Sequence, residues 1–179
     1  MAKTRHAWRS RRKTMLRKDS GFTLMEIMVT TAIFGILAAI AVPNMIGWLP
    51  GHRLHSAAGD IRSNLQLAKT RAIKENRFYA VVFNPVGGSY QVINCGPDRT
   101  YNTGDDQVVK TVRLNEYGSG VAFHSVSYAN NLVVFQPNGL NQTMGYATII
   151  NNRGAQARAG NPSLAGVVVC QNLLGGTWQ

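Results

Sequence analysis

The residue with the clearest chemical role is a single carboxylate at the start of a long apolar run. Glu26 is the only charged side chain between Phe22 and Leu49. A carboxylate inside a membrane helix is costly and is usually paired. Two interpretations remain open: Glu26 reaches the lipid headgroups and has no further role, or it pairs with a cation during assembly.

The assembly interpretation requires a new amino terminus. Cleavage after Gly21 would leave a free amine on Phe22, one helical turn from Glu26. In a helical stack of subunits, Glu26 of one copy would pair with the terminal amine of the next copy. Such a pair is stronger in low dielectric than at a surface, and an unpaired copy is penalised.

A basic block precedes the apolar run. Residues 1–21 contribute +7 of the total charge of +11, from Lys3, Arg5, Arg9, Arg11, Arg12, Lys13, Arg17 and Lys18 against Asp19. Such a block is typical of a nucleic-acid tail or of a cytoplasmic topogenic signal. Because about 20 apolar residues suffice to cross a bilayer, the run that follows favours the second interpretation. A secretory signal would place its cleavage site after the apolar core.

Three elements must position these groups. Residues 22–49 are expected to form a transmembrane helix. Residues 52–77 are expected to form an amphipathic helix, because apolar residues recur at spacings of three and four: Leu54, Ala58, Ile61, Leu65, Ala68 and Ala72. Pro50-Gly51 predicts a kink or short break between the two helices.

After Arg77 the pattern changes to short strands. We expect strands at 78–84, 89–95, 107–114, 120–125, 131–136, 146–151 and 166–171, separated by Gly, Pro and Asn turns. One long helix followed by short strands predicts an α+β fold with a mostly antiparallel sheet. The predicted division is therefore a leader at 1–21, a membrane helix at 22–49 and a β-rich domain within 50–179.

Two further groups of side chains invite a chemical interpretation. Cys95 and Cys170 are the only cysteines, and an oxidising compartment would favour a disulfide over two buried thiols. Asp98, Asn102, Asp105 and Asp106 lie in one loop. This loop would either hold calcium through its oxygens or form a solvated turn with Asx caps.

The stretch Gly21-Phe22-Thr23-Leu24-Met25-Glu26, with its basic leader and apolar run, resembles the class III signal of type IV pilins and type II secretion pseudopilins. The resemblance implies that a prepilin peptidase cuts after Gly21 and methylates the amine of Phe22. It implies that the helix anchors the subunit in the inner membrane and later packs in the filament core. Pro43 matches the proline that kinks the helix in this family, and it removes one backbone donor.

The soluble part is similar to the GspH/FimT group. The similarity lies in Arg53-Leu54, Ser56-Ala57-Ala58 and 67–74, and then in 134–139 and 147–154. Members of this group are minor pilins or pseudopilins that help to prime assembly near the filament tip, and some bind DNA. The tail 159–179 departs from the group by adding an apolar strand.

The DNA-binding members suggest a role for Arg153 and Arg158. A short Gly-Arg-x-Arg motif lies near this position in those members, whereas here Arg153 precedes Gly154 and Arg158 follows after a gap. A few well-placed arginines suffice for phosphate binding. The alternative is two solvated loop arginines.

The resulting prediction is a type IV pilin-like fold and a role in assembly, with no enzymatic activity, cofactor or catalytic residue. The partners implied are a prepilin peptidase, other pilins or pseudopilins, the inner-membrane assembly platform and membrane lipid. The alternative function is a DNA-binding minor pilin that acts in DNA uptake.

Overall fold

The structure is a computed structural model that describes residues 21–179. The predicted leader, residues 1–21, therefore lies outside the described residues except for Gly21. The chain divides into two compact units between Val42 and Pro43.

Helix α1 runs from Leu24 to Glu75. It begins at Thr23, whose Oγ1 accepts a hydrogen bond from the Glu26 backbone N–H at 3.2 Å, as expected of a Thr N-cap. It ends where Asn76 adopts a left-handed φ of 51°. The Arg77 N–H then donates to the Ala72 carbonyl at 3.1 Å, which closes the last turn.

The sequence predicts a kink or a short break at Pro50-Gly51, and the break is wrong because α1 continues through both Pro43 and Pro50. A kink at Pro50-Gly51 stays a prediction. Pro50 has no N–H to donate to the carbonyl of Ile46. That carbonyl accepts from the side chain of Arg153 instead, at 3.4 Å. The predicted kink at Pro43 stays a prediction.

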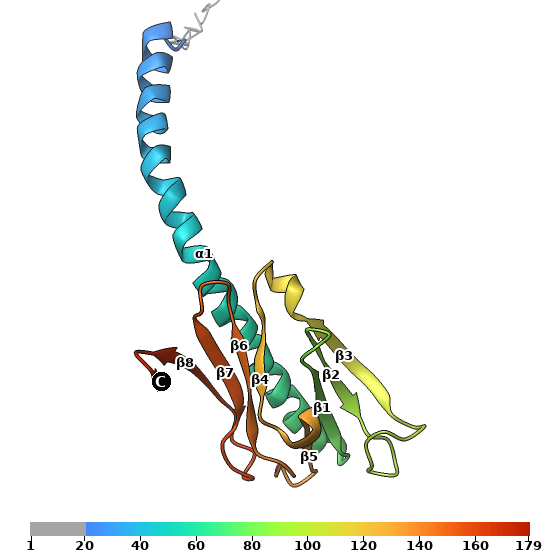
Figure 1. Cartoon of the computed structure of the whole chain (residues 1–179). Coiled ribbons are helices and arrows are strands. Elements are labelled where there is room, and N and C mark those ends of the chain that lie inside the picture. Colours follow the sequence, from blue (N-terminus) through green and yellow to red (C-terminus); the bar gives the residue numbers. More distant parts are fainter. Residues whose placement is uncertain (1–20) are drawn as a thin grey trace, which may run out of the picture. The chain divides into compact units, whose positions relative to one another are not determined.

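Within residues 21–179, nine strands form two antiparallel sheets, and Figure 1 shows their arrangement. Sheet A has the order β3-β2-β1-β5, with β1 at Tyr79–Asn84, β2 at Ser89–Asn94, β3 at Gln107–Arg113 and β5 at Leu132–Phe135. Sheet B has the order β4-β6-β7-β8-β9, with β4 at Ala122–Val126, β6 at Gly145–Ile150, β7 at Gln156–Asn161, β8 at Val169–Leu174 and β9 at Thr177–Trp178. Two short 3-10 helices, η1 (Leu114–Tyr117) and η2 (Ala129–Asn131), lie between β3 and β5.

The main core lies between the second half of α1 and one face of each sheet (Figure 1). All six residues of the predicted helix stripe are buried, so the amphipathic helix is confirmed. Phe83 of β1 joins the two sheets: its ring stacks on Tyr128 with centroids 5.5 Å apart, and it meets Phe123 of β4 edge-on at 6.0 Å. A smaller cluster covers the other face of sheet A, and it contains Ala80, Ile93, Cys95 and Val134.

The first six predicted strands are confirmed as β1 to β6, and their ends differ from the prediction by at most two residues. β7 was not predicted, because its sequence of Gln, Ala, Arg and Gly lacks the β-branched pattern of a strand. Gly160 is required in β7, since a Cβ there would lie 2.1 Å from the carbonyl oxygen of Gly145. The last predicted strand, 166–171, lies three residues later, at Val169–Leu174.

Candidate functional site

Residues 21–26, the part of the N-terminal motif that the structure describes, are all exposed. Gly21, Phe22 and Thr23 precede the helix, and Phe22 is 78% exposed. The Gly21–Phe22 peptide bond therefore lies outside regular secondary structure. Glu26 lies exposed in the first turn of α1, and no ion pair joins it to any residue from 21 to 179.

The first part of α1 exposes a continuous apolar surface. Every residue from 21 to 49 is exposed, and the helix contains an 18-residue window with a mean hydropathy of 2.2. Among the described residues this is the one helix long and apolar enough to cross a membrane. A surface of this size marks contact with lipid or with other proteins.

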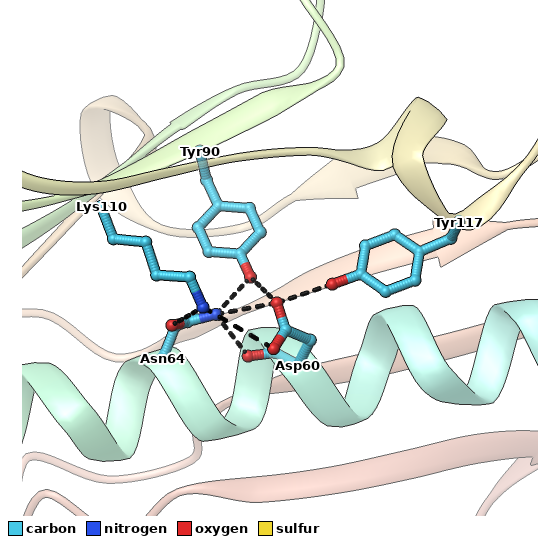
Figure 2. A network of polar contacts seen from close by, with 5 residues as sticks. All are labelled: Asp60, Asn64, Tyr90, Lys110 and Tyr117. Atoms are coloured by element: carbon cyan, nitrogen blue, oxygen red, sulfur yellow. Dashed lines mark hydrogen bonds and ion pairs between the residues drawn. The ribbon is translucent and has the colours of Figure 1, made fainter.

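A polar network that the sequence analysis missed fixes the second part of α1 against sheet A (Figure 2). Tyr90 and Tyr117 both donate to Asp60 Oδ2, at 3.0 and 2.7 Å. Asn64 Nδ2 donates to Tyr90 Oη at 2.8 Å, and Lys110 Nζ donates to Asn64 Oδ1 at 3.0 Å. The available signal was the pair Asp60 and Asn64, spaced by four on an otherwise apolar face.

The electrostatics of this network keep the tyrosines neutral. Burial, and then the Asp60 carboxylate, raise the pKa of Tyr90 well above its usual range. Burial and the hydrogen bond to Asp60 also raise the pKa of Tyr117. Lys110 Nζ lies 4.0 Å from Asp60 Oδ1 and balances the carboxylate. The network therefore holds helix α1 against sheet A.

The β6–β7 turn contacts α1 at the level of Pro50. Arg153 donates to the carbonyls of Gly47 and Ile46. Asn151 Nδ2 donates to the Pro50 carbonyl at 3.3 Å. Arg153 is therefore not a purely solvated arginine, because it satisfies the backbone acceptor that Pro50 leaves unpaired.

Arg158 lies elsewhere, within β7 rather than in a loop. Its guanidinium carbon lies 4.0 Å from the ring centroid of Tyr146 and 4.1 Å from that of Trp178. Its Nε donates to Gln171 Oε1 at 3.0 Å. The interpretation of two solvated loop arginines is wrong for this residue, and Arg153 and Arg158 have separate sets of partners.

The two cysteines are free thiols, so the expected disulfide is absent from this structure. Cys95 is fully buried in the small cluster on the outer face of sheet A. Cys170 lies in β8 of sheet B and packs against the main core. Burial raises the pKa of both thiols, that of Cys95 to about 12.

The acidic loop is a turn closed by its own carboxylates. Asp98 Oδ1 accepts from the Thr100 N–H at 2.9 Å, and Asp106 Oδ2 accepts from the Asn102 N–H at 2.7 Å. Asp105 Oδ1 accepts from the Thr103 hydroxyl at 2.6 Å, and this bond contributes most to lowering the pKa of Asp105. The Asx-capped turn is confirmed. Residues 21–179 contain no group of three or more His, Cys, Asp or Glu placed to hold a metal ion, so the calcium interpretation finds no ligand set there.

Comparison with known proteins places these features in a family. The type II secretion system core protein G of Vibrio cholerae serotype O1 is 56% identical over 32 residues, which are 18% of this chain and 22% of that protein. The type IV major pilin protein PilA of Myxococcus xanthus is 36% identical over 70 residues, which are 39% of this chain and 31% of that protein. The matches thus span less than a third of the length of either relative.

Among solved structures, the minor pseudopilin EpsH from the type 2 secretion system of Vibrio cholerae gives a TM-score of 0.46 at 13% identity. That match covers 66% of this chain and 95% of EpsH. The model of the prokaryotic N-terminal methylation motif matches residues 16–42. The model of type II transport protein GspH matches residues 57–171, more than half of the chain, and the protein therefore belongs to the GspH family.

Proposed function

We propose that this protein is a minor pilin-like subunit that is processed at its N-terminus and joins or primes a filament. The filament is the pseudopilus of a type II secretion system or a type IV pilus. The observation that carries the proposal is the combination of an exposed Gly21–Phe22 bond with an exposed apolar helix that begins two residues later. The methylation-motif match over residues 16–42 supports it independently.

In this proposal the precursor is oriented by charge. The basic leader stays in the cytoplasm, residues 22–49 cross the inner membrane, and residues 50–179 lie in the periplasm. A prepilin peptidase removes the leader after Gly21 and methylates Phe22. The inner-membrane assembly platform and other pilins or pseudopilins are the partners that then move the helix from lipid into the filament.

Glu26 supplies the register of assembly. The structure gives it no ion pair within residues 21–179, although it lies one turn from the future amine of Phe22. A neighbouring subunit's terminal amine would satisfy Glu26 in a low-dielectric core, where leaving it unpaired costs several kcal/mol. Each added subunit would thus be positioned by one charge pair.

Substitution of Glu26 tests the mechanism. With the companion subunits present, Glu26→Gln is expected to be inserted and cleaved normally but to be missing from sheared filaments, as judged by immunoblot. Glu26→Asp, which keeps the charge, is the matched control and should be incorporated in part. Incorporation of Glu26→Gln at the wild-type level would overturn the pairing mechanism, and a mature mass unaffected by Gly21→Arg would overturn the assigned cleavage.

A second candidate function, DNA uptake, is favoured by the surroundings of Arg158. Its half-buried guanidinium lies beside the rings of Tyr146 and Trp178, and basic and aromatic side chains together form many single-strand binding sites. Fluorescence anisotropy across a salt series would test it. Binding that Arg158→Gln abolishes and Arg153→Gln preserves would support this function, and absence of binding at low salt would contradict it.

A further inference from the structure

A group of aromatic and basic side chains lies on and beside α1 where its apolar run ends. We call it the collar, and it consists of Trp48, His52, Arg53 and Arg153. Trp48 is 64% exposed, and its ring stacks on that of His52 with centroids 4.7 Å apart. Because these two are spaced by four, they cover one side of the helix.

The two arginines of the collar belong to different elements of the fold. The Arg53 guanidinium lies against Gly118, in the loop between η1 and β4, so closely that a Cβ at Gly118 would be 2.8 Å from Arg53 Cζ. Arg153 reaches α1 from the β6–β7 turn and donates to the carbonyls of Gly47 and Ile46. A guanidinium has five N–H donors, so Arg153 retains donors for a further acceptor.

No nearby acid in the helix neutralises the collar. Residues 27–59 contain neither Asp nor Glu, and the carboxylate that follows, Asp60, is bonded to Tyr90, Tyr117 and Asn64. The β6–β7 turn, Asn151-Asn152-Arg153-Gly154, contains no acid either. Glu116 lies two residues before Gly118, but within residues 21–179 no ion pair joins it to Arg53 or Arg153. The collar therefore presents positive charge beside an exposed tryptophan.

The position of the collar along the chain suggests what it faces. Helix α1 is about 39 Å long from residue 24 to residue 49, close to the roughly 40–45 Å of a bilayer with its headgroups. Trp48 then lies at headgroup level, where tryptophan is enriched. Arginines at that level attract anionic lipids.

We propose that the collar binds the phosphate groups of anionic phospholipids in the leaflet that faces the folded domain. This inference rests on the membrane anchoring in the proposed function. Arg53 and Arg153 contact the phosphates, and Trp48 and His52 lie among the headgroups. Because Arg53 and Arg153 also contact the domain and the helix, lipid binding seats the domain on the membrane until the subunit leaves for the filament.

The test is lipid selectivity of the full chain reconstituted in phosphatidylcholine vesicles. Spin-labelled phosphatidylglycerol and phosphatidylcholine are compared by electron spin resonance, which gives their relative association with the protein. Each arginine near an anionic surface contributes about a fivefold preference. Arg53→Gln/Arg153→Gln is therefore expected to lose severalfold selectivity relative to wild type, and the difference vanishes at high salt.

Two variants separate the collar from other effects. Arg53→Lys/Arg153→Lys keeps the charge but loses the planar fork, and it should retain most of the selectivity. Arg77→Gln removes an exposed arginine beyond the other end of α1, and it should match wild type. The basic leader is common to all variants, so it cancels in the comparison.

Equal selectivity in wild type and Arg53→Gln/Arg153→Gln would overturn the proposal, as would an equal loss in Arg77→Gln. Alkaline carbonate extraction of the vesicles distinguishes this failure from that of the proposed function. A chain that stays in the membrane without selectivity refutes the collar alone. A chain that carbonate releases refutes the anchoring and the collar together.

Discussion

The two parts of helix α1 have similar helical backbones but different relations to the rest of the molecule. From Leu24 to Leu49 every residue is exposed, whereas from Leu54 to Ala72 eight residues are buried under two sheets. The first part is apolar on all sides, and the second is apolar along one stripe. A stripe directs a helix onto a core of its own chain, while an apolar surface on all sides is covered by lipid or by other proteins.

The largest expected difference between the two parts concerns leucines. Leu65 is 0% exposed in the core, and Leu37 is 57% exposed. Leu65→Ala should lower the free energy of unfolding of the domain by about 2–5 kcal/mol, because it leaves a cavity. Leu37→Ala should change it by less than about 0.5 kcal/mol. Urea unfolding in detergent, followed by near-ultraviolet circular dichroism, measures both, and equal effects would refute the contrast.

Glycines give a second contrast of the same kind. Gly160→Ala forces a Cβ to within 2.1 Å of the Gly145 carbonyl oxygen, a backbone atom of the paired strand. We expect a loss of about 1–3 kcal/mol, as for other overpacked sites. Gly35 has open space around it, so Gly35→Ala should leave the melting temperature of the domain unchanged. A folded Gly160→Ala domain with wild-type stability would show that β6 and β7 pair differently.

The Asp60 network adds a third contrast, since only the second part of α1 has such a network. Asp60→Ala leaves the hydroxyls of Tyr90 and Tyr117 without their acceptor and should cost about 1–3 kcal/mol. Lys110, with a side chain 44% exposed, is the control. Lys110→Met should cost less than about 1 kcal/mol, and a larger cost than that of Asp60→Ala would reverse the assigned roles.

The same network predicts a dependence on pH. The pKa of Tyr90 is raised in the folded protein, so above pH 10 the unfolded chain loses a proton that the folded protein keeps. The contribution of Tyr90 to the free energy of unfolding is therefore fully present below about pH 10. Above that pH it falls by about 1.4 kcal/mol per pH unit. Tyr90→Phe should flatten the decline in unfolding titrations between pH 9 and 11. An unchanged slope would show that Tyr90 ionises freely when folded.

The smallest effect is expected where the turn of sheet B contacts α1. Arg153→Ala removes the donors to the Ile46 and Gly47 carbonyls, a loss of about 0.5–1.5 kcal/mol. Hydrogen exchange of the amides in residues 46–54 should become severalfold faster, while exchange in residues 61–72 stays unchanged. Uniform acceleration along the helix would indicate global destabilisation instead.

The sequence predicted those features that depend on periodicity and local signals. The helix stripe, the Asx-capped loop and most strands follow from spacing and turn residues within a few positions. The features that it did not predict depend on contacts between distant residues. The sequence predicts a break at Pro50 because the compensating donor, Arg153, lies about a hundred residues later in the chain. It assigns Arg158 to a loop because β7 lacks β-branched residues, and the strand conformation of β7 depends on pairing with β6.

Lys110 has a consequence for how copies of this protein meet. It lies in β3, the edge strand of sheet A, and its side chain turns toward the helix to reach Asn64 and Asp60. An inward-pointing lysine is one of the features by which natural sheets discourage the addition of a foreign strand. Copies of the domain can therefore lie close together without pairing along β3, and in the proposed filament the contacts between copies would come from the helix.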